Sequence, residues 1–339
     1  MNVAVKAMFG VLVFPLGVLS YLRTGVTPPR AHMAMIHLFC ATGGRFNDLV
    51  SRLLGRGKAQ LVLPTQAGVI GDLSQDKLGS HLATLRTHGY LVFPKALPQE
   101  TCDRIMRFAL DTPATVRRMD HEPASVGNRI SSYEPGNPKG IRYDYAVDAL
   151  LNNADVQALL ADHALLALSQ AYLGSRPRAD VLSMWWHTNF HSRPDSEAAQ
   201  YFHFDMDRLR WLKIFIYLTD VGPDDGPHTF VEGSHQTGGI PADMLNRGYT
   251  RLTDDEVIAE YGPTRLIEFA APRGTIIIED TRGLHKGKHV SGADRLVLQL
   301  QFSNSLFGAT YPKMTMGKVR DPGLADMLRR APDVYRAFT

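Results

Sequence analysis

The sequence is poor in cysteine, since its 339 residues include only Cys40 and Cys102. Neither belongs to a Cys-x-x-Cys motif, and a single disulfide would be a weak framework for a chain of this length. Two reduced thiols are the simpler interpretation, and they are typical of a reducing compartment. We therefore expect a cytoplasmic protein whose fold depends on a hydrophobic core rather than on disulfides.

The sequence also lacks an excess of one charge, a low-complexity tract and an obvious internal repeat. Its 37 basic and 34 acidic residues give a formal net charge of +3, and no dense basic run is present. Because nucleic-acid-binding domains carry a concentrated positive surface, we expect no nucleic-acid partner. With 44% hydrophobic residues, the chain is long enough for one large core, with or without a smaller subdomain.

Long hydrophobic runs are scarce, and the most prominent one is residues 7–22 at the N-terminus. These sixteen uncharged residues lie between Lys6 and Arg23 and are interrupted by Pro15 and Gly17. The run is shorter than the roughly 18–20 residues of a spanning helix, and no signal-peptide cleavage site follows it closely. The pattern favours a helix docked on the protein. Peripheral membrane association through an interfacial helix comes next, ahead of a signal sequence or a true span.

Hydrophobic periodicity divides the chain into three parts. Residues 1–70 form an N-terminal appendage, residues 71–320 the main domain, and residues 321–339 a C-terminal helix. The main domain begins with helical patterns and continues with short strands that are separated by turns rich in Gly, Pro and Asp. The helices are expected at 76–88, 98–110 and 155–172, and the strands at 90–93, 181–190, 201–205, 212–218, 275–278 and 295–302.

This order of elements predicts an α+β, mainly β fold: a double-stranded β-helix, or cupin-like jelly-roll barrel, buttressed by helices. Residues 212–218 place aliphatic side chains on one face and Lys213, Phe215 and Tyr217 on the other. Residues 295–302 alternate in the same way. Polar side chains on an inward face are typical of a barrel that holds a site rather than a filled core.

The motif His203-Phe204-Asp205, followed much later by His285, is the strongest functional signal. Residues two apart in an extended strand point the same way, so His203 and Asp205 can hold one metal ion and His285 can complete a three-point cap. Two histidines and one carboxylate leave open coordination positions, which suits non-heme Fe(II) in oxygen chemistry. The competing interpretation is that the His-x-Asp triplet occurs by chance and binds no metal. His289 is an alternative to His285 as the third metal ligand.

Four further histidines have weaker patterns. His187 and His191 are four residues apart, but the Glu of the helical zinc-protease motif is missing after the first. His228 and His235 lie in a connection rich in Gly and Pro, so we expect them at turns or on the surface.

Two basic residues could bind an anionic ligand. Arg295 begins an apolar strand and offers a planar fork that binds carboxylates bidentately, although a salt bridge to Asp294 or Asp280 would explain it equally. Lys213 lies on a face expected to be interior, where an unpaired charge is costly. Either the carboxylate of a cosubstrate or a nearby Asp220 would provide its partner.

Together these residues resemble the phytanoyl-CoA dioxygenase family over roughly residues 76–310. The similarity rests on a strand, a turn, a Gly-Ser-His motif and several later positions. These are residues 212–221, Asp225-Gly-Pro, Gly233-Ser-His, Arg273-Gly-Thr-Ile, Asp280, His285 and Arg295.

The resemblance implies an Fe(II)- and 2-oxoglutarate-dependent dioxygenase that uses O2. In that family's pattern His203, Asp205 and His285 would bind iron, Arg295 would bind the distal carboxylate of 2-oxoglutarate, and Lys213 would make another contact to it. Because Asp205 is present, hydroxylation is favoured over halogenation. The implied reaction hydroxylates an unactivated C–H bond of a small-molecule or lipid-like substrate and releases succinate and CO2.

Two alternatives stay open at the level of sequence. One is a non-catalytic cupin-like protein that binds a metal or ligand, for which Arg295 and Lys213 would have no use. The other keeps the cofactors but desaturates or cyclises its substrate. The sequence predicts no oligomeric state. Candidate substrate-pocket residues, each of which could equally serve packing, are Trp186, His187, Asn189, Gln200, Trp211 and Tyr217.

Overall fold

The computed structural model describes residues 3–56, 59–247, 251–312 and 314–338. The α-helices in these ranges are α1 (Val3–Thr24), α2 (Pro29–Thr42), α3 (Arg45–Gly55), α4 (Gln75–His88), α5 (Gln99–Asp111), α6 (Val147–Leu151), α7 (Ala154–Leu160), α8 (His163–Leu173), α9 (Ala242–Asn246), α10 (Asp254–Tyr261) and α11 (Pro322–Arg330). Short 3-10 helices are η1 (Ala124–Val126), η2 (Pro263–Arg265) and η3 (Pro332–Phe338).

The strands of the same ranges form a hairpin, a minor sheet and a main sheet, all with antiparallel pairing. The hairpin is β1 (Ala67–Gly68) with β2 (Gly71–Asp72). The minor sheet has the order β10 (Leu266–Glu268), β9 (His228–Val231), β12 (His285–Gly287). The main sheet has the order β3 (Tyr90–Phe93), β11 (Ile276–Glu279), β8 (Trp211–Tyr217), β13 (Arg295–Ser303), β7 (Arg178–His187), β6 (Arg142–Asp144), β4 (Ala114–Val116), β5 (Arg129–Ser131).

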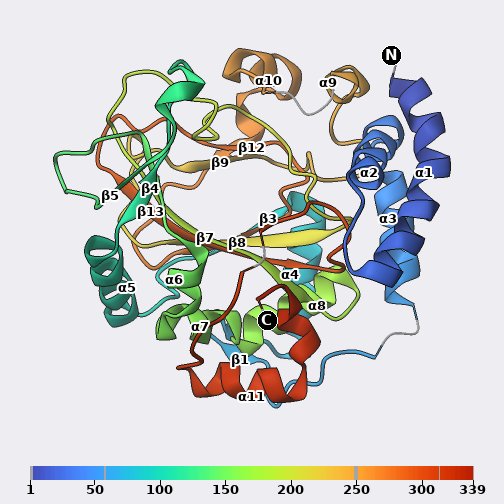
Figure 1. Ribbon diagram of the computed structural model, residues 1–339, viewed down its shortest axis with the longest axis horizontal. Coiled ribbons are helices and arrows are strands. Elements are labelled where there is room, and N and C mark those ends of the chain that lie inside the picture. The colour runs from blue at the N-terminus through green and yellow to red at the C-terminus, as the bar shows by residue number, and fades with distance from the viewer. Residues whose placement is uncertain (1–2, 57–58, 248–250, 313, 339) are drawn as a thin grey trace.

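The minor sheet lies over one face of the main sheet (Figure 1). Helices α4, α7, α8 and α11 lie on the opposite face of the main sheet (Figure 1). This is the helix-buttressed jelly-roll that the order of elements predicts. The space between the two sheets is the interior of the barrel, and residues that point into it are the candidates for a site.

Strand β8 shows how the sequence separates the barrel interior from the helix-covered core. All of its residues are buried. Leu212, Ile214 and Ile216 belong to the core that the helices complete. Phe215 and Tyr217 belong to a second cluster inside the barrel. Because burying one such side chain contributes roughly 1.5–3 kcal/mol, a register shift by one residue would be costly. The predicted alternation is confirmed.

One predicted helix is in fact two. The apolar pattern of residues 155–172 continues without a Pro or Gly, but the structure breaks it between α7 and α8. The cause is Asp162, whose side chain accepts hydrogen bonds from the backbone N–H of Leu165 at 3.0 Å and of Val69 at 2.7 Å. The same carboxylate therefore caps α8 and fastens the β1–β2 hairpin, which spans the boundary expected at residue 70, to the main domain.

Residues 201–205 do not form the continuous strand that the sequence predicts. Their backbone changes partner along the way: Phe202 pairs with Leu252, His203 pairs with His285, and the Asp205 N–H donates to Thr281 O at 2.9 Å. A ladder with one neighbouring strand therefore never forms. Strand β7 also begins earlier than predicted and ends at His187, whereas α4, β3 and α5 occur where they were expected.

The N-terminal helices pack on one flank of the barrel (Figure 1). Helices α1 and α2 approach closely at Gly17, where an added Cβ would lie 2.1 Å from the Cβ of Ala31. Phe14 packs edge-on against Phe46 of α3 and Phe307 of the main domain, with ring centroids 4.8 and 5.2 Å apart. One face of the apolar N-terminal helix is thus docked on the protein, as the sequence favours.

Candidate metal centre

The structure brings His203, Asp205 and His285 together inside the barrel. All three are buried, and one potential ligand atom from each lies within 4.8 Å of the others. His203 Nε2 is 4.0 Å from Asp205 Oδ1, and His285 Nε2 is 3.4 Å from Asp205 Oδ2. The two histidines face each other in an antiparallel backbone pair with hydrogen bonds of 3.0 and 2.8 Å. Such a pair places both side chains on one side.

The second nitrogen of each ring is held by the backbone. His203 Nδ1 lies 2.9 Å from Tyr201 O, and His285 Nδ1 lies 3.0 Å from Gly283 O. Because a carbonyl can only accept, each Nδ1 carries a proton, and Nε2 is the ring nitrogen that faces Asp205. Metal-binding histidines are typically oriented in this way. The three residues therefore fit a divalent metal.

The local charges also favour metal binding. Lys213 Nζ lies 2.5 Å from Asp205 Oδ2. Burial alone would raise the pKa of the Asp205 carboxyl, but Lys213 and His285 together hold it well below its usual range. Burial lowers the pKa of His203 well below its usual value, and His285 adds to this effect. Burial alone would lower the pKa of His285, but Asp205 raises it above its usual value. The ionised Asp205 beside the neutral His203 is the protonation state in which such ligands bind a cation, and a metal would displace a proton from His285.

A second buried pair, His228 and Glu279, lies next to these residues. His228 Nε2 is 3.0 Å from Glu279 Oε2, and the rings of His228 and His285 are 5.6 Å apart. Burial raises the pKa of Glu279 to about 8. The expectation that His228 lies at a turn or on the surface is wrong, because β9 turns its side chain into the barrel. His235 lies in a turn, as expected, but is buried. A charged residue at the end of the run Ile276–Ile278 was the available signal for Glu279.

Arg295 is 2% exposed and faces the barrel interior from the start of β13. Its Nη1 donates to Gly226 O, its Nη2 lies 2.9 Å from His187 Nδ1, and its Nε has no hydrogen-bond partner among the described residues. Within the same part of the chain, no carboxylate forms an ion pair with this guanidinium. A buried charge without a counter-ion is costly, so the arrangement suits an anionic ligand.

The salt bridges considered as alternatives for Arg295 do not form. Asp294 accepts hydrogen bonds from Tyr133 Oη at 2.7 Å and from the backbone N–H of Asn189. Asp280 is bound instead by Arg282, with Nη2 2.8 Å from Oδ2. Both of these carboxylates are therefore engaged with other residues.

Gly287 connects the guanidinium to the histidine cluster. A Cβ at this position would lie 3.1 Å from Arg295 Nη2 and 3.3 Å from His187 Cε1, so a larger residue would press on both side chains. Gly287 is two residues after His285 on β12, and residues two apart lie on the same face about 6.6 Å apart. A ligand of a few carbon atoms can therefore reach from Arg295 to the His/Asp cluster.

The candidate substrate-pocket residues are distributed over several environments. His187 and Tyr217 are buried beside Arg295, whose Cζ lies 5.9 Å from the Tyr217 ring centroid. Trp186 lies on the opposite face of β7, in the helix-covered core, where it stacks on Tyr133 at 3.9 Å.

The other three candidates differ in exposure. Trp211 is fully buried and donates from Nε1 to Thr281 Oγ1 at 2.8 Å. Gln200 is buried, and its Nε2 has no hydrogen-bond partner among the described residues. Asn189 is exposed and donates to Gly292 O. Gln200 is therefore the one of these three with unused hydrogen-bonding capacity.

A second group of potential metal ligands, Asp120, His121 and Asp195, lies in surface loops. Their ligand atoms are also within 4.8 Å of one another, but the first two residues are exposed. Asp195 Oδ2 accepts from the backbone N–H of Asp120, and Asp120 Oδ2 accepts from that of Ser196. These carboxylates hold two loops together, and such a role needs no metal.

A family model described as "Phytanoyl-CoA dioxygenase (PhyH)" matches residues 85–297, which is more than half of the chain. The chain belongs to the phytanoyl-CoA dioxygenase family. It is a 2-oxoglutarate-dependent dioxygenase with Fe(II) and O2 as its other requirements. The family resemblance inferred from the sequence is thereby confirmed. The first 84 residues of this phytanoyl-CoA dioxygenase family member lie outside the match.

Among curated proteins, this family member is similar to the ectoine dioxygenase of Stutzerimonas stutzeri (strain A1501). The two are 23% identical over 218 residues, which cover 58% of this chain and 67% of the relative. Among solved structures, it is similar to EctD from S. alaskensis with bound Fe, at 17% identity and a TM-score of 0.48 over 78% of this chain and 88% of that one. A further similar structure is the epimerase SnoN in complex with Fe3+, alpha ketoglutarate and nogalamycin RO, at 19% identity and a TM-score of 0.47, covering 68% and 84%.

Proposed function

We propose that this dioxygenase hydroxylates an unactivated C–H bond of a small-molecule or lipid-like substrate and releases succinate and CO2. The observation that carries the proposal is the buried, carboxylate-free Arg295 beside a His/Asp/His cluster. A protein that only binds a metal has no use for that guanidinium. The curated relative is named for a small molecule, ectoine, which is consistent with a small-molecule substrate for this chain.

In this proposal His203, Asp205 and His285 hold Fe(II), which together with 2-oxoglutarate supplies the activation of O2. The protein itself orients the metal-binding side chains and excludes water from the site. Tyr201 O and Gly283 O fix the histidine rings. Lys213 keeps Asp205 ionised while the surrounding aromatic side chains exclude water, so the charges act in a medium of low dielectric.

We assign the distal carboxylate of 2-oxoglutarate to Arg295. Its Nε has no hydrogen-bond partner among the described residues. The guanidinium can therefore still donate to a carboxylate, and such contacts are often bidentate. Lys213 lies against Asp205 and so reaches the same space from β8. It would contact the cosubstrate from beside the metal, while Arg295 anchors the other end.

The direct test is an anaerobic titration of the full chain with Fe(II) and then 2-oxoglutarate, which follows the weak visible charge-transfer band of the chelate. The proposal predicts a saturable band. If well-folded, iron-loaded protein gives no band, the non-catalytic binding protein becomes the better interpretation. Once a substrate is found, product mass separates the outcomes: hydroxylation adds one oxygen atom, whereas desaturation or cyclisation removes two hydrogens.

We expect Arg295→Met to raise the KM for 2-oxoglutarate by about 10- to 100-fold, because it removes two charge-assisted hydrogen bonds. The ligand-free variant should melt at the same temperature as the wild type or above it, because a buried charge without a counter-ion is lost. Succinate release and thermal melting with and without 2-oxoglutarate measure both effects. Arg295→Lys keeps the charge but not the planar fork, so its KM for 2-oxoglutarate should fall between those of the wild type and Arg295→Met. An unchanged KM in Arg295→Met would remove Arg295 from the cosubstrate site.

We also propose that the enzyme is cytoplasmic and binds peripherally to a membrane through residues 7–22. Within α1, Ala7–Thr24 is long and apolar enough to cross a membrane by length and composition. The face of α1 that points away from the protein carries only apolar side chains over residues 8–22. The largest of them are Met8, Phe9, Val11, Leu12, Leu16, Leu19 and Leu22, each more than half exposed. Soluble surfaces rarely expose a patch of this kind.

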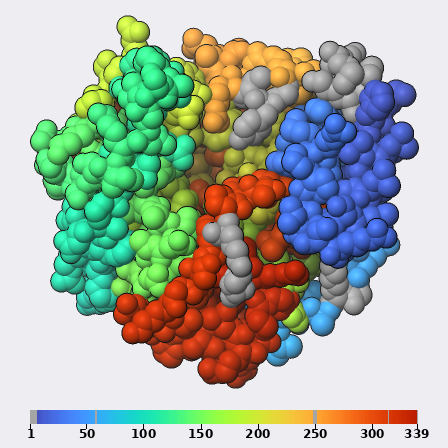
Figure 2. All heavy atoms as spheres, viewed as in Figure 1, coloured from blue at the N-terminus to red at the C-terminus, as the bar shows by residue number. Residues whose placement is uncertain are grey.

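The charges of the same region fit an anionic lipid surface. Residues 1–60 contain seven basic residues and a single acidic one, Asp48. Asp48 is neutralised by Arg282, with Oδ1 2.7 Å from Nη1. Residues 7–56 form one flank of the molecule (Figure 2). Apolar side chains in the interface together with basic residues at the headgroups are typical of interfacial anchoring.

We expect the double variant Leu12→Asp/Leu16→Asp to lose binding to phosphatidylglycerol/phosphatidylcholine vesicles by at least about tenfold in a sedimentation assay. These side chains are 69% and 68% exposed, so the melting temperature should not change. The matched control is Ile130→Asp, because Ile130 is 71% exposed on β5 at the opposite side of the molecule (Figure 1). Equal sedimentation of both variants and wild type would refute the anchoring role.

A further inference from the structure

A cavity of about 610 Å³ opens where α1 and α3 meet the main domain. Its size falls within the roughly 300–1,000 Å³ of typical small-molecule sites. None of His203, Asp205, His285 or Arg295 lines it, so it is separate from the candidate iron site. Its walls come from both helices, from residues 304–307 after β13, and from η3.

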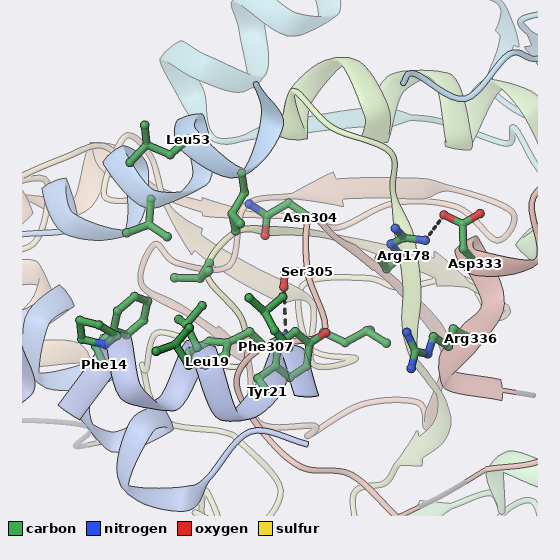
Figure 3. Close-up of a pocket in the computed structure, with 17 residues that line it drawn as sticks. Phe14, Leu19, Tyr21, Leu53, Arg178, Asn304, Ser305, Phe307, Asp333 and Arg336 are labelled. Atoms are coloured by element: carbon green, nitrogen blue, oxygen red, sulfur yellow. Dashed lines mark hydrogen bonds and ion pairs between the residues drawn. The ribbon is translucent and has the colours of Figure 1, made fainter. Parts of the chain in front are cut away.

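The cavity has an apolar end and a charged end. Phe14, Leu19 and Leu53 lie on one side, whereas the ion pair of Arg178 with Asp333 lies on the other, next to Arg336 (Figure 3). Leu19 belongs to the apolar face of α1, so the apolar end is continuous with the proposed membrane-binding surface.

Asn304 is an independent indication that the cavity holds a ligand. Its side chain is 5% exposed and lines the cavity between α3 and α1 (Figure 3). Neither its Oδ1 nor its Nδ2 has a hydrogen-bond partner among the described residues. Burying both polar atoms without partners is unfavourable, roughly 1–3 kcal/mol per group, so a native structure normally provides a partner for them.

The charged end selects the sign of the ligand. Arg178 is paired with Asp333, which also binds Arg176. Arg336 forms no ion pair with any residue in the described part of the chain, and it is an exposed residue that lines the cavity. One uncompensated guanidinium and one amide that can donate and accept, both lining the cavity, favour a single anionic headgroup.

We propose that this cavity binds one single-chain amphiphile with a carboxylate head, such as a long-chain fatty acid. Its hydrocarbon chain would lie between α1 and α3, and its carboxylate would reach Asn304 and Arg336. Because the apolar wall is shared with the exposed face of α1, the ligand could enter from a lipid surface without crossing water. The site would be an accessory lipid site rather than the site of oxidation.

The test is a titration of the full chain with the fluorescent fatty acid cis-parinaric acid below its micelle concentration, with and without Fe(II) and 2-oxoglutarate. We expect saturable binding that is the same in both conditions. Leu53→Trp, which fills the apolar end, should weaken it by about tenfold or more. Leu49→Trp is the matched control, because Leu49 is similarly exposed on α3 but does not line the cavity.

Competition identifies the headgroup contact. Dodecanoic acid should displace the probe from wild type at a lower concentration than dodecanol, and Arg336→Ala should lose this preference while still binding the probe. Arg336 is exposed, so its replacement does not threaten the fold. Absence of saturable binding, or equal binding by Leu53→Trp and Leu49→Trp, would overturn the proposal. Because no turnover or vesicle is involved, that failure is distinguishable from failure of the oxygenase or anchoring proposals.

Discussion

Asp205→Ala is expected to reduce 2-oxoglutarate-dependent succinate release by at least about 100-fold. Loss of an outer-sphere partner of a metal ligand already costs about 10- to 100-fold, and loss of the ligand itself should cost more. The variant also leaves the Lys213 ammonium without the carboxylate that lies 2.5 Å from it. We therefore expect a second effect, weaker Fe(II) retention, because a positive charge next to two histidines opposes a cation.

Iron content after desalting and succinate release measure these two effects separately. Asp207→Ala is the matched control, because Asp207 lies two residues further on and its Oδ2 is 3.7 Å from Lys213 Nζ. It should keep iron and most of the activity. Circular dichroism confirms that both variants are folded. Retention of iron and of succinate release in Asp205→Ala would show that the metal centre lies elsewhere.

The shared orientation of His203 and Asp205 in the candidate metal centre could be predicted because it depends on a short-range pattern, whereas the assignment of His285 rests on the family resemblance. His203 and Asp205 are two apart, and the alternation of β13 places Arg295 on the interior face without knowledge of its neighbours. The inference about their shared face holds although residues 201–205 form only isolated pairings. An extended backbone from His203 to Asp205 is enough to place both side chains on one face, and continuous pairing with one neighbouring strand is not required.

The features that could not be predicted depend on partners far away in the sequence. Glu279 is paired with His228, and neither residue carries a local sign of the other. Asp162 breaks an uninterrupted helical pattern because its carboxylate also serves Val69 in a remote hairpin. The cavity is lined by residues of α1, α3, β7 and η3, which are far apart in the sequence, so it has no counterpart in a local sequence pattern.

Compared with other buried charges, Arg295 is unusual. Arg208 and Arg282 are likewise buried, but each has a carboxylate: Asp180 Oδ2 lies 2.5 Å from Arg208 Nε, and Asp280 Oδ2 lies 2.8 Å from Arg282 Nη2. These two pairs need nothing from outside the chain. The contrast separates the guanidinium groups of Arg208 and Arg282, which are neutralised within the fold, from that of Arg295, which is proposed to bind a ligand, and it predicts different effects of mutation on stability.

We accordingly expect Asp180→Ala to lower the free energy of unfolding by about 3–5 kcal/mol, because Arg208 is 4% exposed and would keep a buried charge without its partner. The carboxylate also accepts from Ser303 Oγ at 3.0 Å, which adds to the loss. This is a large part of the roughly 5–15 kcal/mol that stabilises a typical domain. Urea denaturation measures it.

The decisive control for this prediction is the double variant Asp180→Leu/Arg208→Met, which removes both charges and keeps most of the volume. Replacing a buried ion pair by apolar residues is often close to neutral, so the double variant should be more stable than Asp180→Ala alone. If the two are equally destabilised, the loss comes from packing or from Ser303 rather than from the orphaned guanidinium. Arg295→Met should show no loss at all in the absence of 2-oxoglutarate, since Arg295 has no carboxylate partner among the described residues to leave behind.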